Sequence, residues 1–111
     1  MKRIDFVNGQ LYTETRLKFQ GKVQTTERMM IDTSAPQTVI SEQLALKLGI
    51  EKLDINQQEE MDSLSVGPLK VSQFPVIISD VHEEGVLGLD FLKKVGAKIN
   101  LDAMTISSSR T

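Results

Sequence analysis

Apolar and polar residues alternate along the first third of the chain. Every second position from Leu11 to Phe19 carries Leu, Thr or Phe, and the positions between them carry Tyr, Glu, Arg and Lys. A period of two predicts a strand with one buried face. Asn8-Gly9 before this segment and Gly21-Lys22 after it predict hairpin turns. We therefore expect Val23–Ile31 to pair back against the first strand.

The end of this second strand is apolar at successive positions. Met29, Met30 and Ile31 follow one another without a polar residue between them. This pattern predicts burial on both faces. The two methionines are interpreted as core filler rather than part of a cofactor site.

Two short helices are predicted further along the chain. Ser41 is a plausible N-cap for a helix over Ser41–Leu48, whose apolar positions form one stripe, and Gly49 is a natural stop. A second helix is predicted around Phe91–Val95, ending at Gly96.

The remaining apolar segments predict more strands. Leu64–Val66 and Leu69–Ile78 flank the turn Gly67-Pro68 and should form a hairpin, while Ala97–Leu101 and Met104–Ile106 should form two closing strands. The polar segment Glu51–Asp62 is predicted as a solvated loop or irregular hairpin. The polar tail Ser107–Thr111 is predicted to fray.

These elements predict a mainly β, antiparallel fold with two short helices. The chain has 111 residues, and no linker or fixed-period repeat divides it, so a single domain over residues 1–111 is expected. Hydrophobic residues make up 40% and charged residues 25%, which is ordinary for a globular protein.

Charge and cysteine content exclude several classes of function. Thirteen Lys and Arg against fifteen Asp and Glu give a net charge of -2, so the basic patch of a nucleic-acid or anionic-membrane protein is not expected. The chain has no cysteine, which excludes disulfides and thiolate metal sites. His82 has no second histidine to share a metal with and is interpreted as part of a solvated turn, so no metal or other cofactor is expected. No segment reaches the length of a membrane span, and Met1-Lys2-Arg3 is not followed by an apolar run, so a cytoplasmic protein is predicted.

The segment that carries candidate chemistry is Asp32-Thr33-Ser34-Ala35. An acidic residue directly follows the buried strand end, and two hydroxyl residues and a small residue come next. A carboxylate beside a buried strand is costly unless donors satisfy it. Small residues allow backbone N–H groups and hydroxyls to close around it. A plain turn aspartate is the alternative, because Asp, Thr and Ser are favoured in turns.

The segment Ile31–Ile40 resembles the active-site turn of aspartic proteases, in which Asp-Thr/Ser-Gly-Ala/Ser is followed by an apolar pair. Gly85–Leu92 resembles the second landmark of that family, an apolar pair and a glycine at the start of the last helix. The chain is similar over 7–106 to the retropepsin-like proteases, the small single-lobe family that includes retroviral proteases and their bacterial and cellular relatives. The resemblance implies a closed, barrel-like β fold and an aspartic endopeptidase that cleaves peptides or proteins.

The same resemblance implies a homodimer. Each chain has one such turn, and the reaction uses two carboxylates, so Asp32 of each subunit would supply one. Thr33 would hydrogen-bond across the two-fold axis, and Ser34 and Ala35 would shape the floor of the cleft. Asp90, at the second landmark, is interpreted as the N-cap of the last helix rather than as a catalytic group.

Two departures from the family pattern keep a second function open. Ser34 stands where the family usually has glycine, which permits unusual dihedrals. The segment Ile50–Ser63, where related proteases carry a flap, has no glycine and is acidic, so it is either a solvated face or a selector of basic peptides. The alternative function is a catalytically inactive, retropepsin-like dimeric module that binds peptides or partner proteins.

Overall fold

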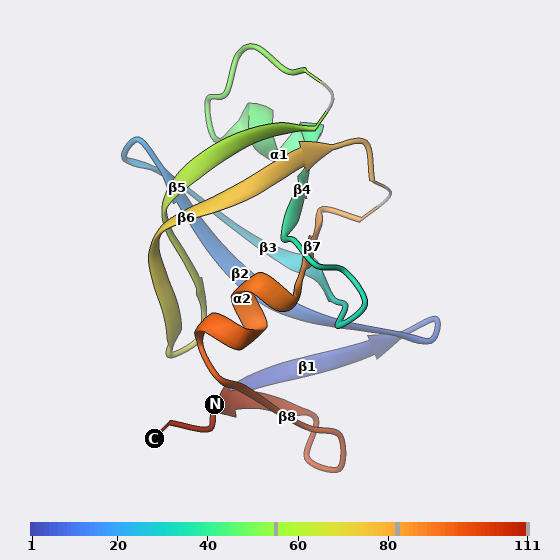
Figure 1. Ribbon diagram of the computed structural model, residues 1–111. Coiled ribbons are helices and arrows are strands. Elements are labelled where there is room, and N and C mark those ends of the chain that lie inside the picture. Colours follow the sequence, from blue (N-terminus) through green and yellow to red (C-terminus); the bar gives the residue numbers. More distant parts are fainter. Residues whose placement is uncertain (55, 82, 111) are drawn as a thin grey trace.

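Strands dominate the structure. The computed structural model describes residues 1–54, 56–81 and 83–110, which form nine strands and two short helices (Figure 1). The strands are β1 (Lys2–Val7), β2 (Gln10–Phe19), β3 (Lys22–Ile31), β4 (Val39–Ser41), β5 (Gln57–Val66), β6 (Leu69–Ser79), β7 (Gly85–Leu87), β8 (Ala97–Asn100) and β9 (Thr105–Ser108). The helices are α1 (Glu42–Lys47) and α2 (Leu89–Lys94). The predicted fold class, mainly β with two short helices, is confirmed.

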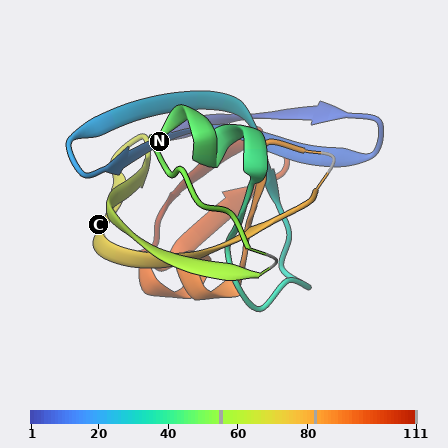
Figure 2. The same ribbon diagram turned by 90° about the horizontal axis from the view of Figure 1, so that it is seen from above.

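Six strands close into a barrel. Their hydrogen-bonded order is β3-β7-β4-β6-β5-β2, and β2 pairs again with β3. From β2 the sheet continues through β1 and β9 to β8, which is its last strand. Figure 1 shows the β5–β6 hairpin crossing the front of the barrel, with α1 above it and α2 below. Seen from above, the β1–β2 turn projects beyond the body of the barrel (Figure 2).

Most pairs are antiparallel, as predicted, but two pairs are parallel. β3 runs parallel to β7, and β4 runs parallel to β6. Parallel neighbours need a long connection, and each of these pairs has at least one helix and one strand between its members. The alternation of side chains along a strand does not report its direction, so this feature was not visible in the sequence.

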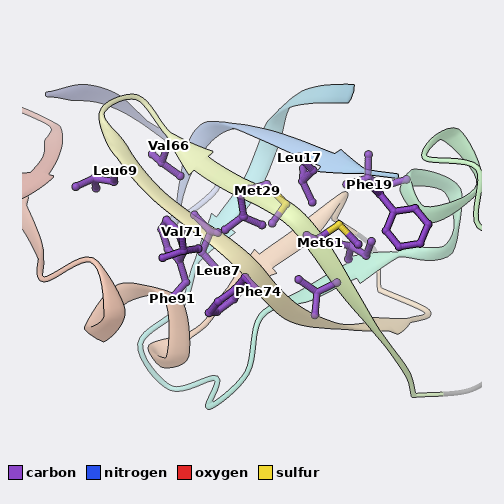
Figure 3. Close-up of a cluster of buried hydrophobic side chains, with 14 of the residues drawn as sticks. Leu17, Phe19, Met29, Met61, Val66, Leu69, Val71, Phe74, Leu87 and Phe91 are labelled. Carbon is purple, nitrogen blue, oxygen red and sulfur yellow. The ribbon is translucent and has the colours of Figure 1, made fainter. Parts of the chain in front are cut away.

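The core fills the barrel and continues under α2. Several large side chains in it have no exposed surface, among them Leu17, Met29, Met61, Leu87 and Phe91 (Figure 3). The rings of Phe74 on β6 and Phe91 on α2 meet edge to face, with centroids 6.1 Å apart. This contact fastens α2 to the barrel wall. No helix in the described part of the chain is long and apolar enough to cross a membrane.

The predicted turns and the first helix are confirmed, with small shifts. Asn8 and Gly9 both have positive φ, as a type I′ hairpin turn requires. The second turn is centred on Gln20 and Gly21, one residue earlier than predicted. The Ser41 hydroxyl accepts a hydrogen bond from the Leu44 N–H at 3.1 Å, so Ser41 caps α1 as expected.

Two polar segments form more structure than their composition indicated. Half of Glu51–Asp62 belongs to β5, because Gln57–Glu60 pair with the apolar end of β6. The C-terminal tail contributes Ser107 and Ser108 to β9. The Arg110 guanidinium also donates to the carbonyl oxygens of Lys93 and Lys94 at the end of α2. Both segments are therefore structured by residues that lie far away in the sequence. The last residue, Thr111, lies outside the described ranges.

Candidate active site

Asp32 lies where β3 ends, beside the end of β7. Ile31 of β3 and Leu87 of β7 are paired neighbours, and the Asp32 N–H donates to the Leu87 carbonyl oxygen at 3.1 Å. The parallel pair therefore brings the two family landmarks together, although β4, α1, β5 and β6 lie between β3 and β7 in the sequence.

The Asp32 carboxylate is held through a single oxygen. Its Oδ1 accepts from the Ser34 N–H at 2.9 Å and from the Ser34 hydroxyl at 2.5 Å. The Ala35 N–H donates to the Asp32 carbonyl oxygen at 3.2 Å and closes the turn. The hydroxyl of Ser34, and then its backbone N–H, lower the pKa of Asp32, while slight burial opposes them. The hydrogen bonds of this turn therefore favour the ionised form of Asp32.

A second carboxylate fixes the far end of the active-site turn. Asp90 Oδ1 accepts from the Thr38 hydroxyl at 2.7 Å, and Asp90 Oδ2 accepts from the Thr38 N–H at 3.1 Å. The Thr38 hydroxyl oxygen in turn accepts from the Gly88 N–H at 3.1 Å. Thr38 is completely buried. The cluster of Thr38, Gly88 and Asp90 therefore joins the turn to the start of α2.

The role expected for Asp90 needs correction. The N-cap of α2 is Gly88, and Asp90 lies in the first turn of the helix, where its carboxylate faces Thr38. Thr38 was not singled out in the sequence. It precedes a short strand and matches no local motif, and its partner lies 52 residues away. The sequence therefore held no local signal that could have identified Thr38.

Gly88 allows the turn and the helix to approach each other closely. A Cβ atom on Gly88 would lie 2.5 Å from the Gln37 carbonyl carbon and 2.9 Å from the Ala35 carbonyl oxygen. A hydrogen bond also joins Ala35 to α2, because the Leu89 N–H donates to the Ala35 carbonyl oxygen at 2.8 Å. The obstructing atoms belong to the backbone and cannot move aside as a side chain can. Glycine is required here for space, and its φ is not in the left-handed region.

Of two hollows in the surface, Asp32 lines neither. The larger, about 730 Å³, lies between α1, β3 and the residues after β6; its wall includes Arg28, Lys47 and Asp80. The smaller, about 380 Å³, is lined by Thr33, by Leu92 of α2 and by Ile99 of β8. The predicted turn at His82 falls outside the described residues. A single subunit thus presents Asp32 on an exposed turn rather than in an enclosed cleft.

The comparisons with known proteins agree with this architecture. The family model described as "gag-polyprotein putative aspartyl protease" matches residues 16–94. The crystal structure of a retropepsin-like aspartic protease from Rickettsia conorii is similar, with a TM-score of 0.71 and 19% identity, covering 92% of this chain and 84% of that one. The retroviral protease-like domain of Ddi1 from Leishmania major is also similar, with a TM-score of 0.64 and 17% identity, covering 90% of this chain and 86% of that one.

No curated protein sequence matches the chain. At these levels of identity, the two structural likenesses establish the fold, while the family rests on the match over most of the barrel and α2. With that match and this fold, the chain belongs to the gag-polyprotein aspartyl protease family and has a retropepsin-like fold.

Proposed function

We propose that two copies of this chain form an aspartic endopeptidase in which each contributes Asp32. The observation that carries the proposal is the geometry of Asp32. Its carboxylate lies on the exposed turn of the first landmark, beside the second landmark, and is anchored through Oδ1 by Ser34. That anchoring orients the group and directs Oδ2 to the reaction.

Peptide hydrolysis needs one carboxylate as a base and one as an acid. The ionised Asp32 takes a proton from a water molecule, and the oxygen of that water attacks the scissile carbonyl carbon. The protonated Asp32 of the second copy donates to the carbonyl oxygen. The first Asp32 then passes the proton that it took from water to the amide nitrogen, the C–N bond of the tetrahedral intermediate breaks, and the amine leaves. As the new carboxyl group forms, one hydroxyl of the intermediate gives its proton to the second Asp32, so the pair regains its starting protonation state. Because the Asp-Thr-Ser-Ala turn occurs once in the sequence, a two-fold axis between two copies is the economical source of the pair.

The surface beside the turn suits a second copy. β8 is the last strand of the sheet order, so one of its edges is open to pairing. Leu101, which follows β8, is 62% exposed, and Leu89 at the start of α2 is 39% exposed. β8 and α2 also line the hollow that reaches Thr33. We propose that this surface, from Leu101 through Leu89 to Thr33, is the dimer interface.

The resemblance to the retropepsin-like proteases also implies that the terminal strands, near residues 2–7 and 104–107, lie at the dimer interface and interleave between subunits. β1 and β9 pair with each other within one chain, with Lys2 beside Ile106 and Arg3 beside Thr105. Both strands therefore already have a partner on that side. The open edge belongs to β8, and the proposed interface uses it in place of exchanged terminal strands.

A cleavage assay tests the proposed activity. The purified chain is incubated with a diverse peptide library from about pH 4 to about pH 7, the range in which a carboxylate pair changes protonation. Cleavage is expected for the wild type and for Glu42→Gln, an isosteric change of an exposed acid on α1, and not for Asp32→Asn. Cleavage that survives in Asp32→Asn would refute the assignment. Peptide binding without cleavage in both proteins would favour the inactive, peptide-binding module.

A further inference from the structure

The side chain of Ser34 makes a contact that the backbone alone would not provide. Any residue except proline would supply the N–H that lies 2.9 Å from Asp32 Oδ1. The hydroxyl, 2.5 Å from the same oxygen, requires serine or threonine at this position. One residue therefore directs two donors at one carboxylate oxygen, and the second donor is a specific property of this chain.

This contact does not depend on a strained backbone. The described non-glycine residues with positive φ are Asn8, Gln20, Asn56, Gln73 and Met104, and Ser34 is not among them. A serine in place of the glycine usual in the family therefore does not put residue 34 in the left-handed region. Alanine can therefore adopt the same turn, which makes removal of the hydroxyl a clean experiment.

Two of the charged groups on neighbouring elements are engaged by residues other than Asp32. Asp90 of α2 is bound by Thr38, and Arg28 of β3 lies over the Tyr12 ring at 5.1 Å. Lys93 of α2 lines the hollow beside Thr33, and Glu84 precedes β7. Among the described residues, the causes of the lowered pKa of Asp32 are the hydrogen bonds of its own turn, and no charged side chain contributes.

We propose that Ser34 is a positioning residue whose hydroxyl fixes the Asp32 carboxylate and sets the pH range in which the Asp32 pair works. This inference rests on the proposed function for its catalytic part. A donor to the ionised form favours that form. The Asp32 pair would be active when its two carboxylates share one proton. A donor to the ionised form in each subunit lowers both pKa values of the pair, so both limbs of the pH–rate profile move to lower pH.

The direct test is a titration of the Asp32 carboxyl carbon by NMR, which needs no activity. Four proteins are compared: wild type, Ser34→Ala, Ser34→Thr, and Ser72→Ala, which removes an exposed hydroxyl from β6. The pKa of Asp32 should rise in Ser34→Ala, return toward the wild-type value in Ser34→Thr, and stay unchanged in Ser72→Ala. Amide spectra of the four proteins establish that the fold is retained.

Acid stability gives a second readout with a defined sign. The folded-state pKa of Asp32 lies below its unfolded value of 3.8, so Asp32 adds stability above that value and loses the contribution as pH falls through the folded-state pKa. Ser34→Ala should therefore be less stable than wild type at neutral pH, with a difference that narrows in acid. A constant difference at all pH values would indicate a purely structural hydroxyl and would overturn the inference.

The outcomes separate this inference from the proposed function. An Asp32 titration that is identical in wild type and Ser34→Ala overturns the role of Ser34, whether or not the protein cleaves peptides. A raised pKa in Ser34→Ala together with no cleavage by any variant supports the role of Ser34 and refutes the protease. If cleavage occurs, the pH–rate profile of Ser34→Ala should move to higher pH on both limbs.

Discussion

At the residue scale, the candidate site divides into a part that sequence reasoning found and a part that it missed. Asp32 and Ser34 are two residues apart, so a local motif revealed them, and their side chains do meet. Thr38 and Asp90 also meet, but 52 residues separate them, and no local pattern predicts their contact. A contact of this kind exists only after the barrel has closed, which is why the sequence pointed to a helix cap instead.

The Thr38–Asp90 contact should contribute measurably to stability. Asp90→Ala removes the acceptor for both Thr38 donors and leaves those donors buried, so the free energy of unfolding should fall by roughly 2–3 kcal/mol. Asp90→Asn keeps one acceptor oxygen and should lose about half as much. Urea denaturation measures both. Asp102→Ala, at an exposed acid after β8, is the matched control and should change stability by less than about 0.5 kcal/mol. If Asp90→Ala and Asp102→Ala lower the free energy of unfolding equally, the Thr38–Asp90 contact does not stabilise the fold.

At the element scale, the apolar strands and α1 were predictable and the polar strand was not. β2 has a clear period of two, and Ser41 caps α1 as its sequence indicates. The first half of β5 is polar and has no such period, and it becomes a strand because β6 offers it a full set of backbone partners. The start of α2 was also misplaced, because Gly88 caps it without a side chain.

The junction between the active-site turn and α2 should tolerate no side chain at Gly88. Gly88→Ala places a methyl group against the Gln37 backbone, and we expect a loss of about 3 kcal/mol, at the upper end of overpacking costs. Gly9→Ala is the comparison, because a Cβ atom on Gly9 would meet no atom within 4 Å. This variant should lose only the cost of its positive φ, about 1–2 kcal/mol of stability. Thermal and urea unfolding of both variants measure this. A Gly88→Ala protein as stable as Gly9→Ala would mean that the close approach is not needed.

At the scale of the whole molecule, closure of the barrel explains why the landmarks meet. The parallel pair of β3 and β7 delivers Asp32 and Gly88 to the same end of the barrel, and no strand-by-strand pattern encodes that pairing. The pairing of β2 with β3 was predicted from the sequence and is confirmed, whereas the short strands β4 and β7 and the two parallel pairs, β3–β7 and β4–β6, were not predicted. A single domain over residues 1–111 and assembly into a homodimer stay predictions.

A single charged substitution at Leu101 tests the proposed dimer interface. Leu101→Asp should weaken self-association about tenfold or more, because burying a leucine contributes roughly 1.5–3 kcal/mol. Leu46→Asp is the matched control, since Leu46 on α1 is 56% exposed, close to the 62% of Leu101. Sedimentation velocity over a concentration series measures both dissociation constants. If the two variants associate equally well, the interface does not include Leu101.

The central claim is that one catalytic centre needs an Asp32 from each of two copies, and a subunit-mixing experiment tests it most directly. Wild-type chain and Asp32→Asn are mixed at constant total concentration, above the dissociation constant, and peptide cleavage is measured against the wild-type fraction. If both carboxylates are needed, mixed dimers are inactive and an equal mixture keeps about a quarter of the activity. A linear decline, with about half of the activity left in an equal mixture, would show that each Asp32 works alone and would contradict the shared pair.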